Sequence, residues 1–250
     1  MARILIAGES WITTSTHTKG VDDFTVHSYT EGVHQLKAAL EAGGHTVTHL
    51  PAHLVPTQFP SDRAALSAYD IVVLSDIGAN SLQLAPDVFD RAQRGSDRIG
   101  ELAEWVRQGG SLLMIGGYLS FSGFQARAAF ARTALVDVLP VELIDADDRV
   151  ERPAGLRAVV LEPGHPALGG VEGEWPHLLG YNKTLRKSGA IELASIGGDP
   201  LIVVGEYGAG RSAVFTSDCS PHWAPPEFCE QWPGYTTIFN GLADWLVARP

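Results

Sequence analysis

Two short polar segments hold the side chains that could do chemistry in this sequence. In the first, residues 116–118, two glycines end an apolar run and turn the next side chain, Tyr118, outward, as in a nucleophile elbow. In the second, residues 218–223, the Cys219 thiol stands three residues before the His222 imidazole. A nearby imidazole can lower the pKa of a thiol or act as its base. These residue types predict a hydrolytic site with Cys219, His222 and Tyr118 among its catalytic residues.

Polar residues also follow the other predicted strands. Glu9 comes directly after the apolar run of residues 3–7, and Asp76 and Asn80 follow the run of residues 71–74. Because the carboxyl ends of parallel strands meet at one edge of a sheet, we expect these side chains to share a pocket. Glu9 is then a further catalytic residue, and the pocket suits a small polar ligand such as a sugar or an amide. The expected ligand-binding residues are Ser10, Trp11, Asp76, Asn80 and Trp223.

Each of these residues also has a purely structural interpretation. Cys219 can be a small buried side chain, with His222 a hydrogen-bond partner of its own turn. Asp76 and Asn80 can cap their turns, because both residue types readily bond to nearby backbone groups. The two tryptophans of the set can pack in the core.

Hydrophobic periodicity predicts a parallel α/β architecture. Short apolar runs indicate strands, and apolar positions at helical spacing indicate the helices that connect them. The expected strands are residues 3–7, 45–50, 71–74 and 111–115, and the expected helices are residues 29–42, 61–66 and 99–108. This alternation is typical of a doubly wound, mostly parallel sheet with helices on both faces.

The C-terminal half predicts an antiparallel extension of that sheet. Residues 190–196, 201–206 and 211–216 follow one another at the spacing of hairpins. Before this extension we expect a helix at residues 125–139 and a strand at residues 156–161, and after it a helix at residues 235–247. Residues 12–25, rich in Thr, Ser and His, keep no sustained period, so we expect a long loop over the strand ends.

Composition limits the partners of the chain. Its net charge of −11 would be repelled by nucleic acid and by an anionic membrane, so we expect neither as a partner. A small polar molecule is the expected partner, and the fold class allows a homo-oligomer. No apolar stretch approaches the ~20 residues that span a bilayer, and two cysteines form no disulfide framework, which indicates a cytoplasmic protein. We expect a single domain over residues 1–250.

Metal and cofactor chemistry have little support in the sequence. No dinucleotide fingerprint follows the first strand and no P-loop occurs, so we expect no nucleotide cofactor. The histidines and carboxylates that could meet at one edge lack the short spacings of zinc sites, so we expect no metal, although convergence from distant loops stays open. They are His17, His27, His34, His222, Glu9, Asp22 and Asp76.

Four segments together resemble a known group of proteins: residues 8–11, 70–80, 116–123 and 216–228. On these segments the chain resembles the class I glutamine amidotransferase-like superfamily, and within it a branch of bacterial proteins of unknown activity. It is more distantly similar to ThuA-like trehalose-utilisation proteins. The resemblance implies a flavodoxin-like fold over the whole chain.

The same resemblance does not carry the amidotransferase mechanism. Class I amidotransferases attack glutamine with an elbow cysteine, assisted by a histidine and by a glutamate two residues later. Here Tyr118 stands at the elbow, and His222 is followed by Trp223 and Ala224. A phenol with a pKa near ~10 stays protonated at neutral pH and does not replace a thiolate. We therefore expect a hydrolytic or ligand-processing enzyme that is not a glutaminase, or else a non-catalytic protein for ligand binding or assembly.

Overall fold

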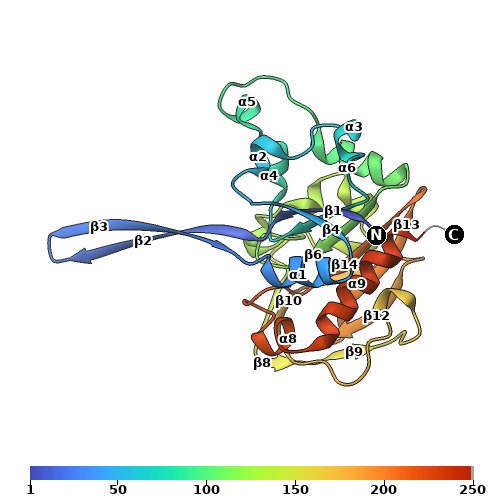
Figure 1. The fold of residues 1–250 in the computed structure, drawn as a ribbon. Coiled ribbons are helices and arrows are strands. Elements are labelled where there is room, and N and C mark those ends of the chain that lie inside the picture. The colour runs from blue at the N-terminus through green and yellow to red at the C-terminus, as the bar shows by residue number, and fades with distance from the viewer. Residues whose placement is uncertain (249–250) are drawn as a thin grey trace.

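An eight-stranded sheet forms the centre of the protein, whose computed structural model describes residues 1–248 (Figure 1). The strand order is β4-β1-β5-β6-β14-β13-β12-β9. Five adjacent strands are parallel: β4 (Thr46–Leu50), β1 (Arg3–Gly8), β5 (Ile71–Ser75), β6 (Ser111–Ile115) and β14 (Gly210–Phe215). The other three are antiparallel: β13 (Asp199–Tyr207), β12 (Ile191–Ile196) and β9 (Ala158–Val160). The predicted mostly parallel sheet with an antiparallel extension is confirmed.

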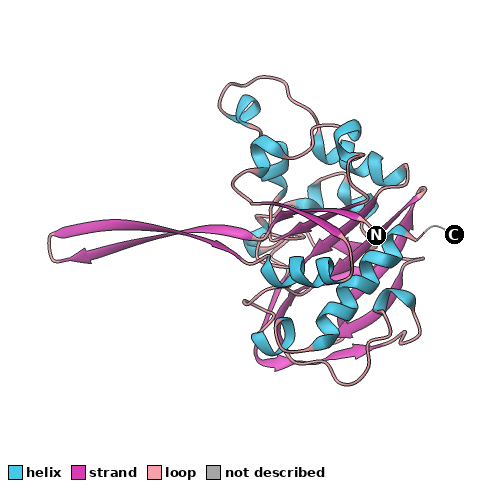
Figure 2. Cartoon of the chain, in the orientation of Figure 1, coloured by secondary structure: helices cyan, strands magenta, loops and turns pink. Residues whose placement is uncertain are grey.

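Helices cover both faces of this sheet, as the alternation of apolar side chains along β1 requires (Figure 2). Ile4 and Ile6 pack with α1 (His34–Ala42) and α9 (Pro233–Val247). Leu5 and Ala7 face the opposite core, which is formed with the following helices: α2 (Val55–Gln58), α3 (Arg63–Leu66), α4 (Ala79–Gln83) and α6 (Arg98–Arg107). A further short helix is α5 (Pro86–Phe89). No described helix is both long enough and apolar enough to cross a membrane.

A long β-hairpin replaces the loop expected at residues 12–25. Strands β2 (Ser10–Lys19) and β3 (Asp22–Glu31) pair along their whole length and project far from the sheet (Figure 1). The expected helix over residues 29–42 starts only at His34, because Tyr29 belongs to β3. Threonine, which branches at Cβ, favours extended chain even where no apolar period marks a strand.

The expected helix over residues 125–139 is also wrong. The structure has two 3-10 turns, η1 (Phe124–Ala126) and η2 (Phe130–Arg132), and one short helix, α7 (Leu135–Val138). Gln125, Ala126 and Ala129 have positive φ angles, which an α-helix excludes.

Two small antiparallel sheets fill the region between α7 and the C-terminal extension. In one, β8 (Arg149–Leu156) pairs with β10 (Leu178–Asn182), and in the other β7 (Val141–Leu143) pairs with β11 (Thr184–Arg186). The expected strand over residues 156–161 is divided between the end of β8 and β9. The remaining short elements are η3 (Pro166–Leu168) and α8 (Pro226–Cys229).

Candidate functional site

The carboxyl ends of β1, β5, β6 and β14 bring the predicted site residues to one edge of the sheet. Glu9 follows β1, Asp76 follows β5 and Tyr118 follows β6. The segment that contains Cys219 and His222 follows β14. Glu9 and Asp76 both have positive φ angles, 48° and 43°, which non-glycine residues seldom adopt outside turns and functional sites. The backbone therefore bends sharply at two neighbouring strand ends.

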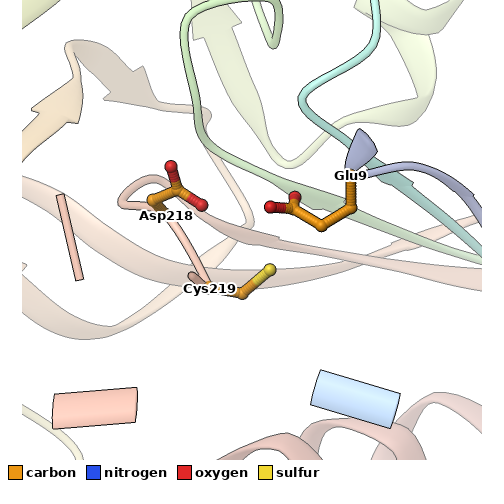
Figure 3. A group of neighbouring side chains, drawn as sticks. All are labelled: Glu9, Asp218 and Cys219. Carbon is orange, nitrogen blue, oxygen red and sulfur yellow. The ribbon is translucent and has the colours of Figure 1, made fainter. Parts of the chain in front are cut away.

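A buried polar layer lies directly on these strand ends. The Glu9 carboxylate accepts hydrogen bonds from Ser75 Oγ at 2.5 Å and from Ser220 Oγ at 2.7 Å. The Cys219 Sγ lies 3.5 Å from Ser75 Oγ. Figure 3 shows the side chains of Glu9 and Cys219 converging with that of Asp218. Glu9 is 1% exposed and Cys219 is 0% exposed, so this layer is closed to solvent.

Burial determines the protonation of this layer. It raises the pKa of Glu9, and the nearby charge of Asp76 raises it further. Burial also raises the pKa of Asp218 well above its ordinary value, with Glu9 as the next cause. The thiol of Cys219 has its pKa raised well above the usual range, mainly by burial. A protonated thiol without exposed surface cannot attack a substrate, so the structure speaks against the nucleophilic role predicted for Cys219.

The same layer contains the one described group of side chains with the spacing of a metal site. Ligand atoms of Glu9, Asp218 and Cys219 lie within 4.8 Å of one another. Both carboxylate oxygens of Glu9 already accept serine hydroxyls, so the group satisfies itself through hydrogen bonds. The histidines considered with Glu9 in the sequence do not join it; His17 and His27 lie on the projecting hairpin.

An accessible layer of aromatic and charged side chains covers the buried one. The rings of Tyr118 and His222 lie 4.2 Å apart between centroids. The Tyr118 hydroxyl donates to Glu151 Oε1 at 2.9 Å, and the Arg149 guanidinium lies 5.0 Å from the Tyr118 ring. Phe124 stacks on the same tyrosine at 5.8 Å. This layer therefore presents aromatic faces next to the charged groups of Glu151 and Arg149.

His222 connects the two layers. Its side chain is 45% exposed, and its Nδ1 lies 3.8 Å from Oδ2 of the buried Asp218. Burial raises the pKa of Asp76, and the proximity of His222 lowers it by a smaller amount. The buried Asp218 and the half-buried Asp76 therefore both lie near one accessible imidazole.

The five expected ligand-binding residues do not all lie at this accessible layer. Ser10 is buried and its Oγ accepts the amide of Ala52 at 2.8 Å. Trp11 lies on the hairpin, and Asn80 is exposed on α4. Asp76 is half-buried and accepts the Leu119 amide at 2.7 Å.

Trp223, the fifth, is a buried support for the site rather than a wall of a pocket. It is 1% exposed, and its Nε1 donates to Glu151 Oε2 at 3.1 Å. Glu151 thus accepts hydrogen bonds from both Tyr118 and Trp223, and this orients the tyrosine ring.

Sequence reasoning missed Asp148, which directly precedes β8, and Asn182, which ends β10. Asp148 accepts the amides of Ser122 and Gly123 at 2.8 and 2.9 Å and the Asn182 amide group at 2.8 Å. Asn182 in turn accepts the Gly117 amide at 3.0 Å. Burial raises the pKa of Asp148 to about 6. No short motif connects these residues, and only the consecutive charges of residues 147–149 mark this part of the chain as unusual.

The turn at Tyr118 departs from a nucleophile elbow. The positive φ of 145° belongs to Gly117, whereas Tyr118 is not among the residues with positive φ. No α-helix follows directly, because Phe121 and Gly123 have positive φ angles of 54° and 71°, which a right-handed helix excludes. The turn presents Tyr118 without the strained geometry that activates an elbow nucleophile.

Two large cavities lie away from this edge. One, of about 610 Å³, lies at the amino ends of the strands, and its Arg3 and Asp70 pair with each other at 2.8 Å. The other, of about 630 Å³, lies against Lys187 and Trp245. Neither is lined by the strand-end residues described above.

Comparison with known proteins shows the family of the chain. Residues 3–248 match the model of a family described as "Putative glutamine amidotransferase". The structure is similar to the Salmonella typhimurium cytoplasmic protein STM3548, with 41% identity, a TM-score of 0.94, and 99% of this chain and 100% of that chain covered. It is equally similar to cytoplasmic protein STM1381 from Salmonella typhimurium LT2, with 44% identity, a TM-score of 0.93, and 98% and 99% covered.

A ThuA-like protein from Parabacteroides merdae shares the fold alone, with 14% identity, a TM-score of 0.56, and 99% of this chain and 90% of that chain covered. A search of curated proteins found no match. The match over nearly the whole sequence, together with relatives above 40% identity, shows that the chain belongs to the family of glutamine amidotransferase-like proteins.

Proposed function

We propose that this protein is a ligand-processing member of its family, in which His222 performs acid–base chemistry on a small polar substrate bound at the strand ends. The observation that carries the proposal is the position of His222, half-exposed and 3.8 Å from a buried carboxylate of Asp218. An accessible imidazole beside a fixed, buried carboxyl group has the position that a general base requires. Cytoplasmic location belongs to the same proposal, and the names of the two Salmonella relatives support it.

The reaction class that fits this arrangement is hydrolysis by a directly activated water molecule. His222 would take the proton of the water as its oxygen attacks the substrate, and would give that proton to the leaving group as the bond to this group breaks. No covalent enzyme intermediate is needed. Tyr118, Arg149 and Glu151 would bind the polar groups of the substrate. Glu9 and Cys219 would support the strand ends from below without touching substrate, because both are buried.

Hydrolysis of p-nitrophenyl acetate tests this role for His222. We expect His222→Asn to lower the rate by about 10²-fold, the contribution typical of a general base. His34→Asn is the matched control, because His34 is 72% exposed on α1 and reports the background activity of a surface imidazole. Equal rates for the wild type and His222→Asn would contradict the proposal.

Glutamine hydrolysis is a separate test of the same site. We expect no release of ammonia from L-glutamine, because the accessible layer offers Tyr118 where a glutaminase needs a thiolate. Ammonia release that disappears in Cys219→Ser would show that the buried thiol becomes exposed during turnover and would contradict the proposed mechanism.

A second candidate is a non-catalytic protein that binds a small polar ligand at the same place. The burial of Cys219 and Glu9 favours this alternative. Saturation-transfer NMR with L-glutamine or galactose as the probe distinguishes the two. Binding that persists in His222→Asn and is lost in Tyr118→Ala, with no turnover by the wild type, would support the binding protein.

A further inference from the structure

The hairpin of β2 and β3 is exposed over its whole projecting length. Every residue from 11 to 30 is exposed, and the ribbon extends beyond the helices and the sheet (Figure 2). This stretch includes large apolar side chains, among them Ile12 at 59%, Phe24 at 48% and Val21 at 99% exposure. Several large apolar residues on one projecting element mark an interaction surface.

Charged residues are confined to the two ends of the hairpin. Lys19, Asp22 and Asp23 lie at the tip and Glu31 lies at the base, while residues 11–18 and 24–30 contain no Asp, Glu, Lys or Arg. Proteins usually protect long exposed strands with charged residues or proline, because free N–H and C=O groups pair readily with other strands. The hairpin has two such edges and lacks that protection along its middle.

Both faces of the ribbon are built for contact. Because side chains alternate, His17 and Phe24 share one face, where their rings stack at 4.8 Å. Ile12 and Tyr29 share the other face, as does the Thr16–Thr25 pair, whose hydroxyls lie 3.1 Å apart. A two-stranded ribbon with neither face covered is marginally stable in water, so a partner would stabilise it.

We propose that this hairpin is the assembly element of the protein and binds the hairpin of a second copy of the chain. Each copy offers the same strand of ten residues, β2, which carries a single charge, so two copies can pair this strand antiparallel to itself about a two-fold axis near Ser15. A self-complementary contact places the same ribbon on both sides of a two-fold axis. The hairpins then add strands to each other through their unprotected β2 edges.

Charge selects the antiparallel arrangement of the two hairpins. The whole chain carries −11, whereas residues 11–30 carry one positive and two negative charges. Antiparallel ribbons keep the two acidic bodies at opposite ends of strands that are ten residues, or ~34 Å, long. That separation is several times the Debye length of ~8 Å at physiological salt, so the bodies do not repel each other. A parallel pair would bring them together.

Sedimentation of the full chain tests the assembly. We expect the wild type to exceed the monomer mass of 26.8 kDa, and the double variant Ile12→Asp/Phe24→Asp, with one charge on each face, to sediment as a monomer. Phe89→Asp is the matched control, because Phe89 is 71% exposed outside the hairpin, and it should assemble like the wild type. A wild type that stays monomeric up to ~100 μM, or a double variant that assembles with less than a tenfold change in Kd, would overturn the proposal.

Engineered cysteines test the geometry without disturbing the fold. Cys219 and Cys229 are buried, so a disulfide between copies must come from the introduced residue. Ser15→Cys lies near the middle of the ribbon, where antiparallel hairpins meet, and should form a covalent dimer on mild oxidation. Val21→Cys at the tip should not, because the tip faces the partner's base. The opposite result, or no disulfide from either variant, would overturn the antiparallel hairpin pair.

Discussion

Asp148 shows how a single buried carboxylate organises the turn beside Tyr118. It accepts two backbone amides and the side chain of Asn182, and burial raises its pKa to about 6. The folded protein therefore holds this proton up to a higher pH than the unfolded chain does. The contribution of Asp148 to the free energy of unfolding is fully present below about pH 4. As pH rises through 6, this contribution falls by up to about 3 kcal/mol.

Replacing Asp148 by Asn should remove this dependence of stability on pH. At pH 7 we expect Asp148→Asn to lower the free energy of unfolding by about 1–3 kcal/mol, because an amide cannot accept all three donors. The loss should be larger at pH 4 than at pH 7, since the variant lacks the proton uptake of the wild type. Urea denaturation across this pH range measures both effects.

Asp147 is a control for that experiment, because its pKa is shifted in the opposite direction. Arg149 lowers the pKa of Asp147 to about 2, so its stabilisation is present above about pH 4 and is lost as pH falls through 2. The cost of Asp147→Asn should therefore not grow between pH 7 and pH 4. A constant cost of Asp148→Asn over the same range would contradict the raised pKa.

Part of the site could be predicted from the positions of single residues in the sequence, and part could not. Glu9, Tyr118 and His222 each follow a strand, so their meeting at one edge follows from the parallel order alone. The burial of Cys219 depends on packing by residues far away in the sequence, which the spacing to His222 does not contain. Glu151, on β8, accepts a hydrogen bond from Tyr118, and no short sequence motif predicts this contact.

At the scale of elements, the junction after β1 requires a glycine. Gly8 has a φ of 106°, and an added Cβ would lie 2.0 Å from the carbonyl oxygen of Ser75. We expect Gly8→Ala to lower the free energy of unfolding by more than about 3 kcal/mol, because backbone strain and overlap add. Thermal or urea denaturation of the purified variant gives the value.

Gly20 at the hairpin tip is the matched control for that substitution. It also has a positive φ, 68°, but an added Cβ would meet nothing within 4 Å. Gly20→Ala should therefore cost only about 1–2 kcal/mol, the penalty of the left-handed backbone. Equal costs at the two positions would show that overlap with Ser75 is relieved by a small shift.

The elements were predictable where the hydrophobic period was strong. The five parallel strands and α6 and α9 lie where apolar runs or helical spacing placed them. The hairpin was missed because its threonines, serines and histidines make no apolar alternation, although they pair in perfect register. The predicted helix began too early, at Tyr29, because this residue fits the helical spacing of α1. Its pairing with Ile12 shows that it belongs to a strand.

At the scale of the whole molecule, the charge of −11 controls how copies approach. Raising ionic strength from 0.01 to 0.15 M shortens the Debye length from ~30 to ~8 Å. We expect the assembly to tighten with salt over this range, because repulsion between acidic bodies is screened while the hairpin contact carries few charges. Sedimentation at several salt concentrations measures the change. Weaker assembly at higher salt would indicate an interface held by ion pairs instead.

The two ends of the hairpin lie side by side. Ser10 opposes Glu31 across the ribbon, and the Gly32 amide donates to the Glu9 carbonyl at 2.9 Å. The chain therefore leaves the sheet and returns to it at the same place, and all eight strands and both cores are complete without the residues between. A short turn from Ser10 to Glu31 would close the gap, which makes this position a permissive site where a tag or a binding loop can be grafted onto an intact domain.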